Sequence, residues 1–367
     1  MTALRTPLCD LLGIEYPIVQ SGMGSAAGPE LAAEVSRAGG LGIVAGLGTT
    51  ADELRRRIRH VRSVTDRPFG VNQWLHSELL PPVDPARVPA ATMRAVQSQL
   101  NVFRERLGVA TTDARAQAFP DLIEEAFAVV LEERVPVWSI GLGNPTPEMV
   151  GRCHERGVKV MAMVATVDDA RAVVASGVDI VVAQGGEAGG HRSTWVKRPR
   201  EEASVATLTL VPQVVDTVRV PVLAAGGIAD GRGLVAALAL GAQGALLGTR
   251  FVATRESMAA EIWKKRLLES DGSATTLSDA FTGLWARVIR NRFSEDYATS
   301  GAPVLPALMQ QLAAQDVYKA ATEQRDAEHI ALYAGQSAGL VHDLPGAAEV
   351  VEAIAREARR VLERLTR

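Results

Sequence analysis

The 367-residue sequence contains only two cysteines, Cys9 and Cys153, and aromatic residues make up only 4 % of it. The cysteines have neither CxxC nor metal-ligand spacing, so we expect no disulfide framework, no metal site and a reducing compartment. Neither sign of charge dominates, because 39 basic residues face 42 acidic ones and the net charge is −3. This balance argues against nucleic acid or an anionic membrane surface as a partner.

Long apolar runs are also absent. No run approaches the roughly 18 residues of a membrane span, and no basic stretch followed by an apolar run marks a signal peptide. We therefore expect a cytoplasmic protein without a membrane partner. Hydrophobic residues nevertheless make up 47 % of the chain, enough for a sizeable core of Val, Leu, Ala and Ile.

Short apolar runs alternate with helical patterns along most of the chain. The expected strands are 17–22, 41–46, 69–74, 135–140, 158–164, 178–183, 220–225 and 242–247. The helical patterns between them include 29–38, 52–64, 121–133, 147–156, 168–176 and 233–240. Such alternation predicts a parallel sheet, and eight strands close a barrel whose interior is filled by side chains.

An open, doubly wound sheet is the structural alternative. Gly22-Met-Gly-Ser-Ala-Ala-Gly28 is similar to a dinucleotide-binding glycine pattern, but its spacing is one residue too long. That pattern also requires an acidic residue after the second strand, where this chain has Ile43-Val-Ala-Gly-Leu-Gly48. We therefore predict the α/β class with a (β/α)8 barrel.

Two segments, 79–119 and 255–335, interrupt the alternation. The first contains a polar helical pattern at 91–107, and the second is helical in pattern throughout. We predict that both lie over the mouth of the barrel, with 255–335 as a helical cap domain for the substrate. The barrel domain then comprises 1–254 and 336–367. Its last helix is predicted from the apolar stripe of Val350, Ile354, Val361 and Leu365.

A glycine-rich loop, Gln184-Gly-Gly-Glu-Ala-Gly-Gly-His191, follows the expected strand at 178–183. Glycines let the backbone approach a ligand closely, and histidine is the side chain best matched to proton transfer near neutral pH. His191 is therefore the candidate catalytic residue, and a surface turn with a solvent-facing histidine is the alternative. Among the six histidines, His76 is the competitor, because it lies just past the expected strand at 69–74.

Two more glycine loops follow the last two expected strands, at Gly226-Gly227 and at Leu247-Gly248-Thr249. Phosphate groups bind near these loops in (β/α)8 barrels. Both loops offer main-chain N–H groups, and the helix after the first loop presents its N-terminus to an anion. The alternative is that the glycines only permit tight turns.

Polar residues end several other expected strands, including Ser21, Asn72, Gln73 and Gln184. Amide and main-chain groups suit the edge of a flavin ring, which has both donors and acceptors. Asn72 fits equally well as a buried residue that satisfies a backbone group.

The motifs around these residues are PIVQSGMG, AGGLGIV, FGVNQ, AQGGEAGGHR, LAAGGIADGRGLVAALALGAQGALLGTRF and AGQSAGLVHD. Together they resemble the nitronate monooxygenases, formerly called 2-nitropropane dioxygenases, which are FMN-dependent TIM-barrel enzymes. The resemblance runs from residue 17 to about 257 and returns at 335–342. The chain departs from the family pattern at 139–144 and after His191, where Arg192 follows; both departures line the presumed substrate space.

The resemblance implies FMN as the cofactor, His191 as the active-site histidine and no metal. The candidate cofactor-binding residues are Ser21, Gly22, Met23, Asn72, Gln184, Gly189, Gly190, Gly226, Gly227, Leu247, Gly248 and Thr249.

The implied reaction is the oxidation of an alkyl nitronate or a nitroalkane by O2 to a carbonyl compound and nitrite. FMN-dependent NAD(P)H:quinone reductases and a flavin-dependent enoyl reductase use the same barrel with similar motifs, so fold and flavin do not fix the reaction. A flavin-binding regulatory protein is the non-enzymatic alternative. Homo-oligomer formation is left open by the sequence.

Overall fold

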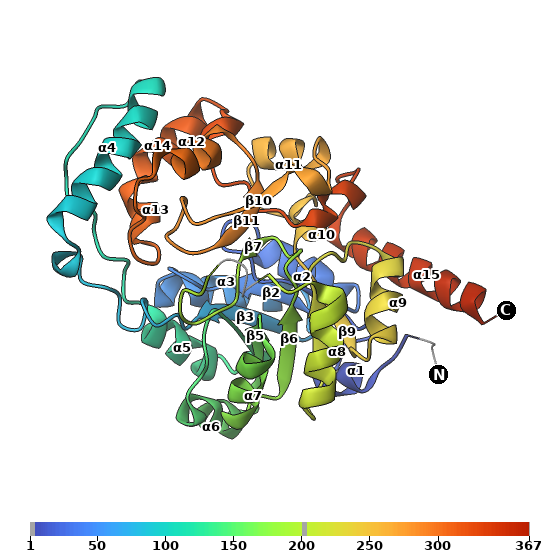
Figure 1. Ribbon diagram of the computed structural model, residues 1–367. Coiled ribbons are helices and arrows are strands. Elements are labelled where there is room, and N and C mark those ends of the chain that lie inside the picture. Colours follow the sequence, from blue (N-terminus) through green and yellow to red (C-terminus); the bar gives the residue numbers. More distant parts are fainter. Residues whose placement is uncertain (1–3, 200–203, 367) are drawn as a thin grey trace.

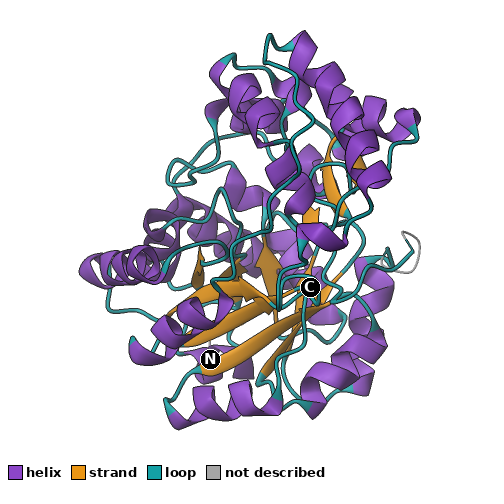
Figure 2. Ribbon diagram, turned by 90° about the vertical axis from the view of Figure 1, so that its left-hand side faces the viewer, coloured by secondary structure: helices purple, strands orange, loops and turns teal. Residues whose placement is uncertain are grey.

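The computed structural model describes residues 4–199 and 204–366. The main sheet has eight parallel strands. Helices cover its outer side (Figures 1 and 2). The strands are β1 (Ile18–Gln20), β2 (Gly42–Ala45), β3 (Phe69–Trp74), β4 (Val137–Gly141), β5 (Lys159–Val164), β6 (Ile180–Gln184), β8 (Val222–Ala225) and β9 (Gly244–Leu247).

The strands pair in the order β1-β9-β8-β6-β5-β4-β3-β2. Between the two end strands, the Leu41 N–H donates to the Ile18 carbonyl and the Gln20 N–H donates to the Leu41 carbonyl, both at 2.9 Å. These bonds join β1 to the start of β2 and close the ring. The predicted (β/α)8 barrel is confirmed, and the open sheet is excluded.

Helices follow the strands, and all except α8 and α10 were predicted by the pattern. They are α2 (Pro29–Arg37), α3 (Ala51–Val64), α5 (Ile123–Glu132), α6 (Pro147–Glu155), α7 (Val167–Ala175), α8 (Thr207–Thr217), α9 (Gly231–Ala239), the short α10 (Thr249–Val252) and α15 (Ala347–Leu365). The sequence did not predict α8, because Pro212 lies inside it and proline lacks the N–H of a helical hydrogen bond.

The side chains of the strands alternate between two cores. Val19, Ile43 and Leu223 fill the barrel interior together with residues of α1 (Pro7–Leu12). Strand neighbours such as Val44 point outwards and pack against the helices, as the period of two requires. Because α1 fills one end of the barrel, the open end is at the carboxyl ends of the strands.

Segments 79–119 and 255–335 share a second core above the open end (Figure 1). Their elements are η1 (Pro85–Arg87), α4 (Ala90–Arg106), α11 (Glu261–Leu268), η2 (Gly272–Ala274), β10 (Thr275–Ser278), β11 (Ala286–Ile289), α12 (Arg292–Ser300), α13 (Met309–Ala313), α14 (Gln315–Glu323) and η3 (Ala327–His329), with η4 (Gln336–Leu340) following. The buried Arg104 of α4 donates to the Asp316 carboxylate of α14 at 2.7 Å. The division into a barrel domain and a cap domain remains a proposal, and its outer bounds, 1 and 367, lie outside the described residues.

The pattern predicted that the segment 255–335 is helical throughout, and this prediction is wrong. Strands β10 and β11 form a hairpin, and β11 pairs with β7 (Gly190–His191), the two-residue strand at the end of the glycine-rich loop. These strands are four residues long or shorter, and β11 pairs with β7 about 95 residues away along the chain. A local pattern cannot reveal such pairing.

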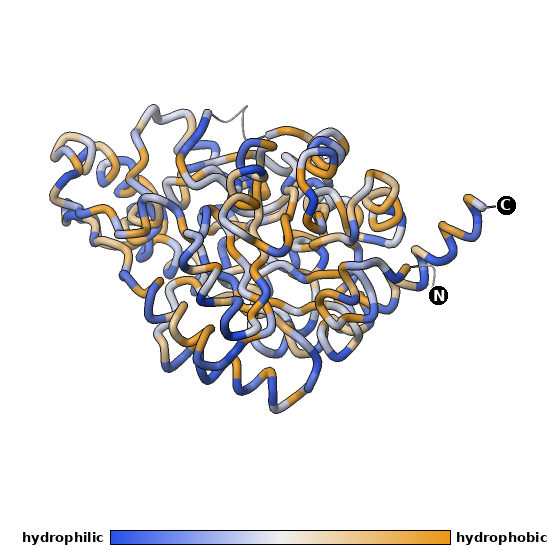
Figure 3. Tube along the Cα trace, turned by 90° about the horizontal axis from the view of Figure 1, so that it is seen from below, coloured by the Kyte–Doolittle hydropathy of each residue, from blue (hydrophilic) through white to orange (hydrophobic). Residues whose placement is uncertain are grey.

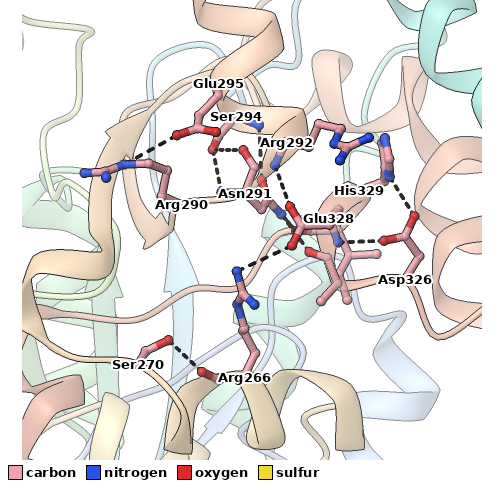
Figure 4. A network of polar contacts seen from close by, with 12 residues as sticks. Arg266, Ser270, Arg290, Asn291, Arg292, Ser294, Glu295, Asp326, Glu328 and His329 are labelled. Atoms are coloured by element: carbon pink, nitrogen blue, oxygen red, sulfur yellow. Dashed lines mark hydrogen bonds and ion pairs between the residues drawn. The ribbon is translucent and has the colours of Figure 1, made fainter.

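A polar network fixes the end of the cap (Figure 4). The Asn291 side chain caps α12, and its Nδ2 donates to the carbonyls of Ala327 and Ile330 at 2.9 and 2.8 Å. The next stretch then runs beside β11, where the Ile289 N–H donates to the Leu332 carbonyl at 2.8 Å. The network therefore holds the segment that carries Tyr333.

Helix α15 packs on the barrel through Val350 and Ile354, which are buried. Its last turns extend beyond the body of the molecule (Figure 3), and Leu365 is 68 % exposed. Val361 of the predicted apolar stripe still packs against the core, whereas Leu365 does not. None of the helices in the described part of the chain is long and apolar enough to cross a membrane.

Candidate active site

A cavity of about 470 Å³ lies at the carboxyl ends of the barrel strands, beneath the cap. It brings together every predicted catalytic and cofactor-binding residue except Leu247, whereas the other candidates Gln73 and His76 lie outside its wall. The candidates in its wall are Ser21, Gly22, Met23, Asn72, Gln184, Gly189, Gly190, His191, Gly226, Gly227, Gly248 and Thr249.

Leu247 does not line this cavity. Its side chain belongs to the core between the strands and the outer helices, because alternation along β9 turns Leu246 towards the cavity instead. Only its main chain remains close to the site, where its carbonyl accepts from the Ser21 N–H at 2.9 Å.

The two phosphate-type loops lie side by side in the cavity wall. The N–H groups of Gly227, Gly248 and Thr249 have no acceptor within residues 4–199 and 204–366. Gly226 and Gly227 have φ values of +106° and +73°, a region that glycine tolerates far better than other residues. The loops therefore offer a set of free donors to an anion.

The N-terminus of α9 is not available to an anion, in contrast to the prediction. The Asp230 carboxylate accepts from the Gly233 N–H at 3.0 Å, and the Glu357 carboxylate accepts from the Gly231 N–H at 2.8 Å. Two carboxylates occupy the donors and repel a second negative charge. The phosphate prediction therefore rests on the glycine loops alone.

The amide candidates divide by the face of the strand on which they lie. Asn72 donates from Nδ2 to the Ser139 carbonyl at 3.1 Å, which leaves its Oδ1 towards the cavity. Gln73 points the opposite way and bonds to Ile123 and Trp138. Only Asn72 is placed for a ligand.

Gln184 holds the loop that carries His191. Its Nε2 donates to the His191 carbonyl at 2.8 Å, and its Oε1 accepts from the Ser193 N–H at 2.8 Å. The buried Arg192 donates to the Gln184 and Gly185 carbonyls at 2.8 and 2.9 Å. Gln184 and Arg192 are therefore primarily supports of the loop.

Ser193 connects the two places where the chain departs from the family pattern. Its Oγ accepts from the Leu142 N–H at 2.9 Å and donates to the Met163 carbonyl at 2.8 Å. Leu142 lines the cavity with a φ of +53°. The two departures are thus in direct contact, but only 139–144 reaches the cavity wall. Arg192 and Ser193 do not line the cavity, in contrast to the prediction.

His191 sits on β7 with its ring in the wall of the cavity. Its Nε2 lies 2.9 Å from Thr282 Oγ1, and its ring contacts Trp74 and Tyr333 at centroid distances of 4.6 and 5.3 Å. Loss of hydration on burial, with a smaller effect of nearby His76, lowers the pKa of His191 to about 3. The imidazole is therefore neutral at physiological pH.

Thr282 decides which nitrogen of His191 serves the cavity. Its Oγ1 lies 3.3 Å from the Leu284 carbonyl, which can accept the hydroxyl proton. The same oxygen also accepts from the Leu284 N–H at 3.4 Å. With its proton directed to the carbonyl, Thr282 accepts a hydrogen bond from His191 Nε2–H, and we assign this tautomer to His191. Nδ1, which has no partner among the described residues and is not enclosed, keeps its lone pair.

His76, the competing histidine, does not line the cavity. It is 1 % exposed, its Nδ1 accepts from the Glu78 N–H at 3.2 Å, and burial lowers its pKa. Of the two candidates, only His191 reaches the space where a ligand fits.

Sequence reasoning missed the aromatic part of the wall. The missed lining residues are Trp74, Phe119, Trp263, Leu308, Gln311, Tyr333 and Ser337, most of them from the segments 79–119 and 255–340. Trp and Tyr residues are few in this chain, and three of the nine face this one cavity. Their rarity was the signal that could have marked them as candidate site residues.

Comparison with known proteins identifies the family of the chain. The model of the family described as nitronate monooxygenase matches residues 5–357. The chain belongs to the nitronate monooxygenase family. A probable nitronate monooxygenase of Staphylococcus aureus strain Newman is 33 % identical over 344 residues, which cover 93 % of this chain and 94 % of the relative.

Solved structures place this member of the nitronate monooxygenase family beside two enzymes. Nitroalkane oxidase from Streptomyces ansochromogenes is 36 % identical, with a TM-score of 0.86 over 98 % of this chain and 99 % of that one. FabK from Thermotoga maritima is 33 % identical, with a TM-score of 0.75 over 99 % of both chains. The nitronate monooxygenase family is flavin-dependent, and the protein is an oxidoreductase.

Proposed function

We propose that the protein binds FMN and oxidises alkyl nitronates with O2 to a carbonyl compound and nitrite. The observation that carries the proposal is the position of His191. Its neutral imidazole stands in the wall of a cavity that also contains two loops of free main-chain N–H donors. The likeness to nitroalkane oxidase supports the choice of nitro compounds as substrates.

The residues of the cavity fit FMN. The free N–H groups of Gly227, Gly248 and Thr249 suit its phosphate, and the Oδ1 of Asn72 suits an N–H at the edge of the ring. The isoalloxazine supplies the electron transfer between substrate and O2. The cap covers the cavity and excludes bulk water from it.

His191 manages the proton in this scheme. Its Nδ1 lone pair accepts the α-proton of a neutral nitroalkane, while Thr282 orients the ring through Nε2. Because the pKa of the ring is about 3, the imidazole is a weak base. We therefore expect a preformed nitronate, which needs no deprotonation, to be the better substrate.

The proposal is tested by the products and the cofactor. Purified protein given a nitronate should consume O2 and release nitrite, and acid should liberate FMN. Release of FAD, or O2 uptake without nitrite, contradicts it. An enoyl-type or quinone reductase is the second candidate, favoured by the 33 % identity to FabK, and it requires reduction of the flavin by NAD(P)H.

The pH dependence should reflect the neutral histidine. Activity that needs the unprotonated ring is retained as pH falls through 6.5, the ordinary histidine pKa, and is lost only towards about 3. The profile of kcat/KM for a nitroalkane, which reports free-enzyme ionisations, should show no acidic limb between pH 8 and 5. A limb near 6.5 contradicts the burial argument.

Thr282→Val should slow the reaction with neutral nitroalkane. Valine keeps the shape but loses the hydroxyl that orients His191 Nε2 at 2.9 Å. Removing a hydrogen bond worth about 1.4 kcal/mol corresponds to a roughly tenfold fall in kcat/KM. Thr282→Ser should restore the rate, and the orienting role is wrong if serine is as defective as valine.

A further inference from the structure

The hydroxyl of Tyr333 is a free polar group in the cavity wall. Among the described residues this hydroxyl has no hydrogen-bond partner, and it is not fully enclosed. By contrast, the two other tyrosines of the cap are bonded, Tyr297 to the Pro303 carbonyl at 2.7 Å and Tyr318 to the Phe281 carbonyl at 3.1 Å. Tyr333 is therefore the cap tyrosine whose hydroxyl is left for a ligand.

Tyr333 is held firmly in this position. Its main chain forms a bridge with Val288 of β11, and the Asn291 network fixes the residues just before it (Figure 4). Its ring lies 5.3 Å from that of His191 and 6.0 Å from that of Trp263, measured between centroids. The hydroxyl is thus presented on a rigid wall beside the catalytic candidate.

The charge of the site shows why a neutral donor is needed. No Lys, Arg, Asp or Glu among the described residues lines the cavity, and His191 is neutral there. An anion that enters therefore meets no counter-ion and must be held by N–H and O–H donors. Burial raises the pKa of Tyr333, so its hydroxyl keeps its proton and can donate.

We propose that Tyr333 is a substrate-binding residue whose hydroxyl donates a hydrogen bond to the oxygen of a planar oxyanion bound beside His191. Where the oxyanion is a nitronate, the inference rests on the function proposed above. Trp74 and Trp263 flank the same space, so the oxyanion is expected to carry an apolar rather than a charged substituent.

Tyr333→Phe tests the proposal, because it removes only the hydroxyl. The KM for preformed nitronate should rise about 10–100-fold, the effect of losing a hydrogen bond to a charged group. A binding measurement accompanies it. Isobutyrate, an unreactive carboxylate with the same planar oxyanion, should bind the flavin-loaded variant more weakly by a similar factor, as read from the shift of the flavin absorbance band.

Tyr318→Phe is the matched control, because it removes a cap hydroxyl that bonds to protein and not to a ligand. It should leave both constants at their parental values. The proposal is overturned if Tyr333→Phe also leaves both unchanged, or if the two variants weaken binding equally. Should the parent protein oxidise no nitronate, the proposed function fails, and isobutyrate binding still decides the role of Tyr333.

Discussion

His191→Asn should lower kcat/KM for a neutral nitroalkane about 10²–10⁴-fold, the range typical of losing a general base. The variant should retain much of its activity on preformed nitronate. The difference arises because only the nitroalkane has a proton to lose, and Nδ1 of the cavity-lining His191 has no partner among the described residues. Parallel steady-state assays with the two substrates measure the effect.

A role for His191 as an imidazolium anchor gives another pattern, in which both substrates suffer and the KM for nitronate rises. The pKa of about 3 favours the base over the anchor. His76→Asn is the matched control, since this buried histidine does not line the cavity. Parental rates for His191→Asn together with an inactive His76→Asn would move the catalytic role to His76.

Gly226→Ala should abolish tight flavin binding. At a φ of +106° a side chain is strained, and its Cβ would lie 2.9 Å from the Ala188 nitrogen and 3.0 Å from Thr207 Oγ1. Strain of this kind costs about 1–3 kcal/mol, and relief of the clash with Ala188 and Thr207 must change the position of the loop relative to Gly248 and Thr249. The measurements are the flavin content of the protein and the rise in Tm on adding FMN, which binding to the folded state produces.

Gly151→Ala is the control for an added methyl group. Gly151 lies inside α6, and a Cβ added there would have no neighbouring atom within 4 Å. Alanine there should stabilise the helix by about 0.5–1 kcal/mol and leave flavin binding unchanged. Parental flavin content and an undiminished FMN-dependent rise in Tm in Gly226→Ala would show that this loop does not hold the phosphate.

Features determined by nearby residues were predictable from the sequence. Strand β3 occupies 69–74 as expected, and the glycine loops at 184–191, 226–227 and 248–249 all reach the same cavity. Each of these loops follows a buried apolar run directly. Parallel strands place their carboxyl ends at one side of the barrel, so the convergence of these loops followed from the fold.

Features that depend on distant partners were not predictable. Thr282 reaches His191 across 91 residues of chain, and Tyr333 is placed by pairing with β11. The carboxylate of Glu357, from the last helix, occupies the N-terminus of α9. The prediction for Leu247 was wrong by one position along β9. Because side chains alternate along a strand, that one position separates the face towards the cavity, where Leu246 lies, from the face towards the core.

Anaerobic mixing of the purified, flavin-loaded protein with preformed nitronate and, separately, with NADH tests the central claim most directly. The account predicts that nitronate alone bleaches the oxidised flavin band, because this substrate supplies the electrons without a nicotinamide. It also predicts no bleaching by NADH. Rapid bleaching by NADH, with nitronate leaving the band unchanged, would contradict the account and identify a reductase.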